Sequence, residues 1–293
     1  MINRLAIIGV GLIGGSLARA LRDAGHVREI VGHGRGFANL QRAVDLGVID
    51  RVETTLPAAV RAADMVVLAT PVGGMKKILR AIAPYLAPDA VVTDVGSVKG
   101  VIVDAARKLL GKRFANFVPG HPIAGTERSG VEASFASLYV GRRVVLTPLP
   151  ETRAEAVQRV RAMWQAAGAE VVTMTVEHHD TVLAATSHLP HLLAYTLVDM
   201  LARQGDAREI FSYVAGGFRD FTRIASSDPV MWRDISLANR DAIVSLLKQY
   251  RREVESLIKA VAAGDGEKLH TVFARAKAVR DALVTNDQKK QEP

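Results

Sequence analysis

The sequence contains no cysteine. This absence excludes a disulfide scaffold, a zinc–thiolate site, an iron–sulfur cluster and a cysteine nucleophile. Aromatic residues make up only 5% of the chain, which disfavours nucleic-acid binding because few rings are available to stack on bases. No apolar run reaches the roughly 18 residues that a bilayer span requires, and no signal-peptide cleavage site follows the apolar N-terminal stretch. We therefore expect a cytoplasmic protein with no membrane partner.

The 293 residues carry a formal net charge of +8, and 49% of them are hydrophobic. This composition is typical of a globular protein, and the length suggests two domains that each bury a core. The positive charge suits attraction of phosphates or carboxylates. General solubility explains the charge better, because the basic residues are scattered along the chain.

Short apolar runs alternate with amphipathic segments over residues 1–175. The runs at 5–8, 29–32, 64–69, 90–94, 143–147 and 170–174 are typical of buried parallel strands, and helical spacing lies between them. The alternation predicts an α/β fold with a Rossmann-type, doubly wound parallel sheet. Over residues 176–293 only helical patterns occur, so we expect an all-helical substrate and dimerisation domain. Its apolar faces pack within the chain or against a second copy, and we expect a homodimer.

A glycine-rich turn at residues 9–14 has the pattern G-x-G-x-x-G between a strand and a helix. In this setting Gly9 permits the tight turn, Gly11 lets the backbone approach a pyrophosphate, and Gly14 lets the helix pack on the strand. The amides that begin the helix, at Leu12 and Ile13, would face the phosphates. The turn predicts a nicotinamide dinucleotide site, although glycine needed only for packing would leave the same pattern.

The second strand ends without the acidic residue that usually binds the ribose of NAD. His33 and Arg35 stand there instead. An arginine at this place can hold the 2′-phosphate of NADP, so we expect NADP in preference to NAD. Alternatively, Arg35 stacks on the adenine, which suits either cofactor.

Three further segments follow strands at the edge where such sheets bind ligands. We expect Thr70, Pro71 and Asp94 to lie beside the cofactor. Ser97 either binds substrate or caps the next helix. His121 stands in a loop bounded by glycine and proline, and a neutral histidine suits a base that takes a hydroxyl proton as hydride leaves; a structural histidine is the alternative.

The helical half offers two histidines and two arginines for the chemistry. His188 and His191 suggest half a metal site, but no acidic partners match their spacing, so we predict no metal and a polar helix face beside Pro190. Arg219 and Arg223 are candidate anchors for a substrate carboxylate. A surface ion pair is the alternative for each arginine.

Six segments together resemble the prephenate/arogenate (cyclohexadienyl) dehydrogenase family of tyrosine biosynthesis. They run in the family's order between residue 2 and about residue 250: GVGLIGGS, ATPV, DVGSVK, GHPIAGTE, SHLPH and GFRDFTRIASSDPVMW. The GHPIAGTE and FTRIASSDP segments are specific, whereas the glycine turn is not.

The resemblance implies oxidative decarboxylation of prephenate to 4-hydroxyphenylpyruvate, or of arogenate to tyrosine, with hydride transfer to NAD(P)+. It implies that His121 is the base, that Ser97 orients it, and that Arg223 anchors a carboxylate. The remaining substrate contacts that it implies are Thr126, Glu127, Ser187 and His191. The family usually dimerises through its helical domain.

Two other functions share parts of this pattern. A hydroxy-acid dehydrogenase or a pyrroline-carboxylate reductase would have the same glycine turn but would not explain GHPIAGTE. A non-enzymatic protein that senses NADP would bind the cofactor without oxidising either acid.

Overall fold

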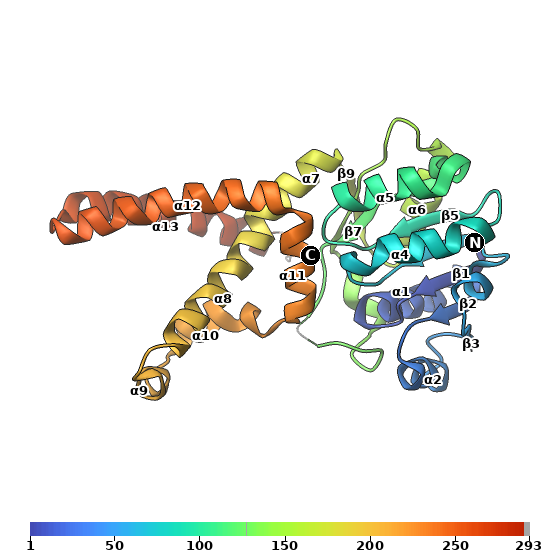
Figure 1. Cartoon of the computed structure of the whole chain (residues 1–293), viewed down its shortest axis with the longest axis horizontal. Helices are drawn as coiled ribbons and strands as arrows, with labels where there is room; N and C mark the ends of the chain where they lie inside the picture. Colours follow the sequence, from blue (N-terminus) through green and yellow to red (C-terminus); the bar gives the residue numbers. More distant parts are fainter. Residues whose placement is uncertain (127, 290–293) are drawn as a thin grey trace. The chain divides into compact units, whose positions relative to one another are not determined.

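A six-stranded parallel sheet forms the first part of the computed structural model, which describes residues 1–126 and 128–289 (Figure 1). Its strands lie in the order β3-β2-β1-β4-β5-β6, and every neighbouring pair is parallel. This is the strand order of a Rossmann sheet, so the predicted fold class is confirmed. The strands are β1 (Ile2–Ile8), β2 (Val27–His33), β3 (Arg51–Val52), β4 (Met65–Leu68), β5 (Val91–Asp94) and β6 (Phe117–Val118).

Alternate residues of the central strands enter two different cores. Leu5 and Ile7 of β1 pack with α1 and α6, whereas Ala6 and Ile8 pack with α4 and α5 on the opposite face. Burial on both faces explains why β1 and β4 are continuous apolar runs instead of alternating patterns. The helices that accompany this sheet are α1 (Leu12–Asp23), α2 (Phe37–Asp45), α3 (Leu56–Val60), α4 (Val72–Ile82), α5 (Gly100–Leu110) and α6 (Ala154–Ala166).

The glycine turn between β1 and α1 depends on two glycines for its geometry. Gly9 has φ +104°, a left-handed conformation, and a Cβ there would lie 2.3 Å from the backbone oxygen of Ala69. A Cβ on Gly14 would lie 2.2 Å from the backbone oxygen of Gly9. A Cβ on Gly11 would meet no protein atom within 4 Å, so the space beside this residue is open.

The strands at residues 143–147 and 170–174 do not extend the parallel sheet, and that part of our expectation is wrong. They form a separate three-stranded sheet in the order β7-β8-β9, in which β7 is antiparallel to β8. Its strands are β7 (Gly120–Pro122), β8 (Arg143–Leu146) and β9 (Glu170–Thr173). Pro119 separates β6 from β7 and has no N–H to continue a ladder, and its carbonyl accepts from the backbone N–H of Thr147. The chain therefore leaves the first sheet at Pro119 and pairs with β8.

Every regular element described after β9 is helical, which confirms the predicted helical region. A continuous helical path begins with α7 (Val176–Leu183), passes through a π-helical segment (Ala184–His188) and continues as α8 (Leu189–Ala202). The buried residue Asn239 separates the helices Pro229–Ala238 and Arg240–Ala262. The later helices are α9 (Ala207–Ser212), α10 (Gly216–Thr222), α11 (Pro229–Ala238), α12 (Arg240–Ala262) and α13 (Gly266–Lys289).

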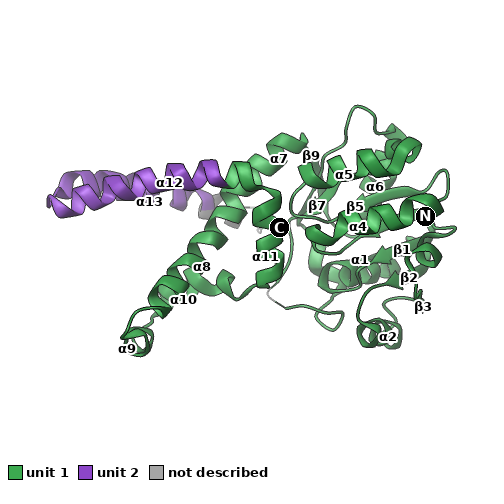
Figure 2. Cartoon of the chain, in the orientation of Figure 1, with its two compact units in different colours: residues 1–243 green, residues 244–293 purple. Residues whose placement is uncertain are grey.

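Backbone contacts divide the chain into two compact units, residues 1–243 and 244–293 (Figure 2). The predicted domains, 1–175 and 176–293, follow the change from α/β to helical structure and remain a proposal. Within the described part of the chain, no helix combines the length and apolar composition that a bilayer span needs.

The glycine turn yields a prediction about stability. We expect Gly14→Ala to lower the free energy of unfolding by about 1–3 kcal/mol, because its Cβ must push against the backbone of Gly9. Gly11→Ala is the matched control, and its effect should stay within about 1 kcal/mol because its Cβ meets open space. Urea unfolding of both variants measures this difference, and equal losses would contradict it.

Candidate active site

A fully buried ion pair connects the end of β5 with the start of α5. The ammonium of Lys99 donates to the carboxylate of Asp94, and it donates at 2.6 Å to the backbone oxygen of Gly120. Asp94 also accepts from the backbone N–H of Gly96 at 2.8 Å and of Gly120 at 3.3 Å. Burial lowers the pKa of Lys99, and the attraction of Asp94 opposes that effect. The pair thus fixes the residue that immediately precedes His121.

His121 lies in β7 with its imidazole buried against a second imidazole. Its Nδ1 is 2.9 Å from Nε2 of His179, and the two rings meet edge to face. Burial lowers the pKa of His121 well below its ordinary value, and the neighbouring His179, Lys99 and His188 lower it further. The imidazole is therefore neutral near pH 7, which is the state that a base requires.

Asp180 connects this histidine pair with helix α5. Its Oδ1 lies 2.7 Å from Nδ1 of His179, and its two oxygens accept from the backbone N–H groups of Lys99 and Gly100, each at 2.8 Å. Burial alone would raise the pKa of Asp180, but the hydrogen bonds from His179, Lys99 and Gly100 lower it overall. The N-cap residue of α5 is Lys99, and its own side chain does not bind the first amides of the helix. The Asp180 carboxylate binds them instead, which is the capping role that the sequence suggested for Ser97.

His188 is buried instead of lying on a polar helix face, so that interpretation is wrong for this residue. Its Nδ1 lies 3.1 Å from the amide nitrogen of Asn239, and its Nε2 has no partner among the described residues. His191 stacks on Trp232 with ring centroids 3.6 Å apart, and it donates from Nδ1 to the backbone oxygen of Ser187 at 2.9 Å. Within the described ranges, no three histidines or carboxylates are arranged to hold a metal ion.

The predicted cofactor residues lie along one edge of the six-stranded sheet. The strand register places Ile8 beside both His33 and Leu68, and Leu68 beside Asp94. The residues that follow these positions, including the glycine turn, Thr70 and Pro71, therefore meet at the carboxyl ends of the strands. The Thr70 hydroxyl is buried and has no partner in the described part of the chain. Together with the open space at Gly11, this unpaired hydroxyl fits a site that receives a polar ligand.

The side chains at the adenosine end of this edge are held by nearby backbone. Nδ1 of His33 donates to the backbone oxygen of Glu53 at 2.8 Å, and the carboxylate of Glu53 pairs with Arg4 and Arg51. Arg35 follows on the connection between β2 and α2, where no acidic residue intervenes.

Other predicted substrate residues lie on loops and short helices. Thr126 is exposed, and its hydroxyl accepts from the backbone N–H of Arg128 at 3.2 Å. Glu127 lies outside the described residues. Arg219 belongs to α10, and Arg223 begins a short 3-10 helix (Arg223–Ser226) that contacts α8.

Three residues of the buried network escaped sequence reasoning. Lys99 stands in the DVGSVK segment but received no role, and the adjacent His179 and Asp180 were not singled out. The signal for the last two was the run of two histidines and an aspartate at 178–180. Local spacing contains no sign that this run faces His121.

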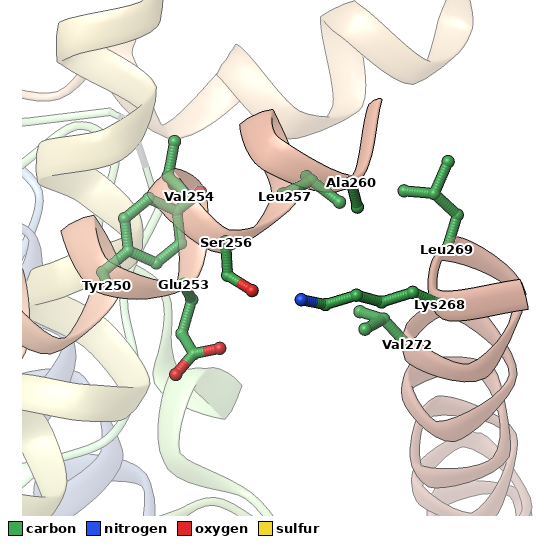
Figure 3. A pocket seen from close by; sticks show the side chains of 9 residues that line it. All are labelled: Tyr250, Glu253, Val254, Ser256, Leu257, Ala260, Lys268, Leu269 and Val272. Carbon is green, nitrogen blue, oxygen red and sulfur yellow. The ribbon is translucent and has the colours of Figure 1, made fainter. Parts of the chain in front are cut away.

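A separate cavity of 160 Å³ lies within residues 244–293, between α12 and α13 (Figure 3). Tyr250, Leu257 and Val272 line it, and Lys268 points across it toward Ser256. It contains none of the predicted site residues.

Two family models match consecutive parts of the chain. One is described as prephenate dehydrogenase, nucleotide-binding domain, and matches residues 17–173. The other is described as prephenate dehydrogenase, dimerization domain, and matches residues 175–275. The chain belongs to the prephenate dehydrogenase family.

Relatives named as cyclohexadienyl, prephenate and arogenate dehydrogenases are similar over nearly the whole chain. Cyclohexadienyl dehydrogenase of Zymomonas mobilis is 38% identical over 97% of this chain and 97% of its own. Prephenate dehydrogenase from Aquifex aeolicus, solved with hydroxyphenyl propionate and NAD+, is 38% identical, with a TM-score of 0.90 over 97% of this chain and 99% of its own. Synechocystis arogenate dehydrogenase is 29% identical, with a TM-score of 0.80 over 96% of this chain and 99% of its own.

Membership of the prephenate dehydrogenase family confirms what the six motifs indicate. The chain is an oxidoreductase of tyrosine biosynthesis with a nucleotide-binding domain and a dimerisation domain. The reaction class therefore follows from the family, and the assignment of roles to individual residues remains to be argued from their geometry.

The buried histidines lead to a prediction about acid stability. Burial lowers the pKa of His188 to about 4, so the folded protein resists a proton that the unfolded chain accepts below about pH 6.5. The part of the stability that depends on neutral His188 is therefore present above pH 6.5 and is lost as the pH falls toward 4. At pH 5 the free energy of unfolding is lower by about 2 kcal/mol from this residue. Urea unfolding at neutral pH and at pH 5 should show a smaller loss for His188→Gln than for the wild type. Identical losses in the two proteins would refute this effect.

Proposed function

We propose that this chain converts prephenate to 4-hydroxyphenylpyruvate and that His121 is the base. The observation that carries the proposal is a buried, neutral imidazole beside the sheet edge that carries the glycine turn. The Aquifex relative was solved with hydroxyphenyl propionate, which shares the hydroxyphenyl ring and the carboxylate of this product. The alternative is arogenate, or both substrates, because relatives with arogenate and cyclohexadienyl names are also similar.

In the proposed reaction the protein accepts a proton from the substrate and later returns it to the product. The bound nicotinamide cofactor accepts the hydride from the ring carbon that bears the hydroxyl group. His121 takes the hydroxyl proton as that hydride leaves, and the opposite ring carbon loses carbon dioxide. The ring becomes aromatic, so the protein has to supply orientation and a base. The product's phenolate oxygen is more basic than imidazole and takes the proton back, which leaves no net proton on the protein.

The other substrate contacts are proposals that rest on chemistry and position. Ser97 is proposed to hydrogen-bond the hydroxyl group beside His121. His191, fixed by its stack on Trp232, is proposed to line the pocket with Ser187. Arg223 is proposed as the carboxylate anchor, with Arg219 as the alternative, because guanidinium binds carboxylates through two parallel hydrogen bonds. Thr126 and Glu127 are proposed as loop contacts.

For the cofactor, we propose that the segment 9–14 holds the pyrophosphate and that Thr70, Pro71 and Asp94 border the nicotinamide half. Asp94 would act there through its backbone, because its carboxylate is fully engaged with Lys99 and two amides. His33 and Arg35 are proposed to favour NADP. The Aquifex relative was solved with NAD+, so use of NAD+ is the alternative.

A homodimer through the helical region is proposed as the assembly. The matched model for residues 175–275 describes a dimerisation domain. Large apolar side chains on α12 and α13 are exposed in the single chain, including Ile258, Val261, Phe273 and Val279. A second copy would remove them from water. A cytoplasmic location remains a prediction.

Replacing the proposed base tests the function. Purified wild-type protein should reduce the cofactor with prephenate faster than with arogenate. His121→Asn should lower kcat by about 100- to 10,000-fold, because general-base catalysis is lost. Cofactor affinity, measured by fluorescence titration, should stay unchanged. Wild-type turnover in the variant, or inactivity of the wild type toward both acids, would reject the proposal.

Arg35 tests the cofactor preference. If it holds a 2′-phosphate, Arg35→Ala should lower kcat/KM for NADP+ by about 10- to 100-fold, the value of a charge-assisted hydrogen bond. The value for NAD+ should change by less than about threefold. Equal losses with both cofactors would instead indicate that Arg35 stacks on the adenine.

A further inference from the structure

An unbroken chain of hydrogen bonds runs from His121 to the start of α5. It passes from Nδ1 of His121 to Nε2 of His179 at 2.9 Å, and from Nδ1 of His179 to the carboxylate of Asp180 at 2.7 Å. It ends at the backbone N–H groups of Lys99 and Gly100, which donate to the same carboxylate. Both imidazoles in the chain are buried.

The direction of each hydrogen bond follows from the carboxylate at its end. An ionised carboxylate only accepts, so Nδ1 of His179 carries a proton and donates it to Asp180. Burial lowers the pKa of His179, so its ring is neutral and its Nε2 is an acceptor. Nδ1 of His121 must then be the donor, and the lone pair of His121 resides on Nε2.

We propose that His179 and Asp180 are positioning residues that hold His121 in the tautomer with Nε2 free to act as the base. This inference rests on the proposed role of His121. In the opposite tautomer, Nε2 would carry a proton and could not accept one from the substrate hydroxyl. Burial alone does not select between the two tautomers, whereas the series of hydrogen bonds from His121 through His179 to Asp180 does.

The same chain balances the charge that His121 gains during the reaction. When Nε2 takes the hydroxyl proton, the imidazolium donates through Nδ1 to His179, whose other nitrogen donates to the negative Asp180. Lys99 and His188 also face His121 and oppose its protonation, and Asp94 offsets Lys99 by direct pairing. Asp180 is thus the carboxylate connected to His121 by hydrogen bonds through His179.

Asp180 is held in place independently of the two histidines. Its carboxylate caps the 11-residue helix α5, where the helix dipole favours a negative charge. Its backbone oxygen accepts from the side-chain amide of Asn239 at 2.8 Å. A group fixed from both sides can impose an orientation on His179 instead of adapting to it.

Asp180→Asn tests the tautomer directly. An NH2 group in the place of Oδ1 would donate to His179 and reverse both hydrogen bonds, while the oxygen in the place of Oδ2 still accepts from the backbone N–H of Gly100. The backbone N–H of Lys99 loses its acceptor in this variant. We expect kcat to fall by about 100- to 10,000-fold, as expected when an aspartate no longer orients a catalytic histidine. The KM for prephenate and the cofactor affinity should change by less than about threefold. Long-range proton–nitrogen NMR of histidine-labelled protein with its cofactor should show the His121 proton on Nε2 instead of Nδ1.

A pair of variants at His179 covers the case in which Asp180→Asn does not fold. In His179→Gln the amide oxygen can accept from Nδ1 of His121, whereas His179→Leu removes the acceptor. We expect the kcat of the leucine variant to be at least about tenfold lower than that of the glutamine variant. The matched control is His178→Asn, because His178 is the exposed neighbour on the same helix. It should behave as the wild type does.

The outcomes separate this inference from the proposed function. An active wild type, an inactive His121→Asn and an unchanged His121 tautomer with near-normal kcat in Asp180→Asn would overturn the inference alone. Equal activity of the two His179 variants would also overturn it. Full activity of His121→Asn would remove the proposed function itself, and the inference with it.

Discussion

The buried ion pair between Asp94 and Lys99 is the interaction on which the candidate active site depends. Removing two charges from water costs several kcal/mol for each ion, and attraction offsets this cost only when hydrogen bonds satisfy the remaining polar atoms. Here the N–H groups of Gly96 and Gly120 donate to Asp94, and the carbonyl of Gly120 accepts from Lys99. Because Gly120 directly precedes His121, the pair fixes the imidazole relative to the sheet edge that is proposed to hold the cofactor.

Two carboxylates support this imidazole indirectly, Asp94 through Gly120 and Asp180 through His179, and both are held by backbone amides. Asp94 accepts from two N–H groups and Asp180 from two others, so each oxygen set is already engaged before a substrate arrives. The surrounding histidines are neutral because burial lowers the pKa of His121, His179 and His188. The charged groups of the site are therefore held in place, Asp94 and Lys99 by their ion pair and Asp180 by the amides of α5. The ring of His121 is neutral and can exchange a proton.

Local patterns in the sequence predict the parts of this structure that depend on neighbours along the chain. The apolar runs at β1, β4 and β5 and the turn at Gly9 are visible because each encodes its own burial or backbone conformation. The strands β3, β6 and β7 have only two or three residues each and leave no periodic signal. The second sheet was missed because Pro119 changes the pairing partner, which local spacing does not reveal. His179 and Asp180 were missed because their roles arise from packing against residues about 60 to 80 positions away.

The π-helical segment between His179 and His191 determines where the chain length can vary. Its five residues, Ala184–His188, lie within an otherwise α-helical path, and each α-helical residue turns the chain by about 100°. A π-helical hydrogen bond spans one residue more than an α-helical one, so this segment absorbs one extra residue with little rotation of the helix that follows. Removing one residue within it would therefore leave His179 beside His121 and His191 on the face of Trp232. An insertion or deletion in the α-helical parts of the same path would instead rotate His191 about the helix axis by about 100° relative to His179 and separate the two halves of the histidine cluster.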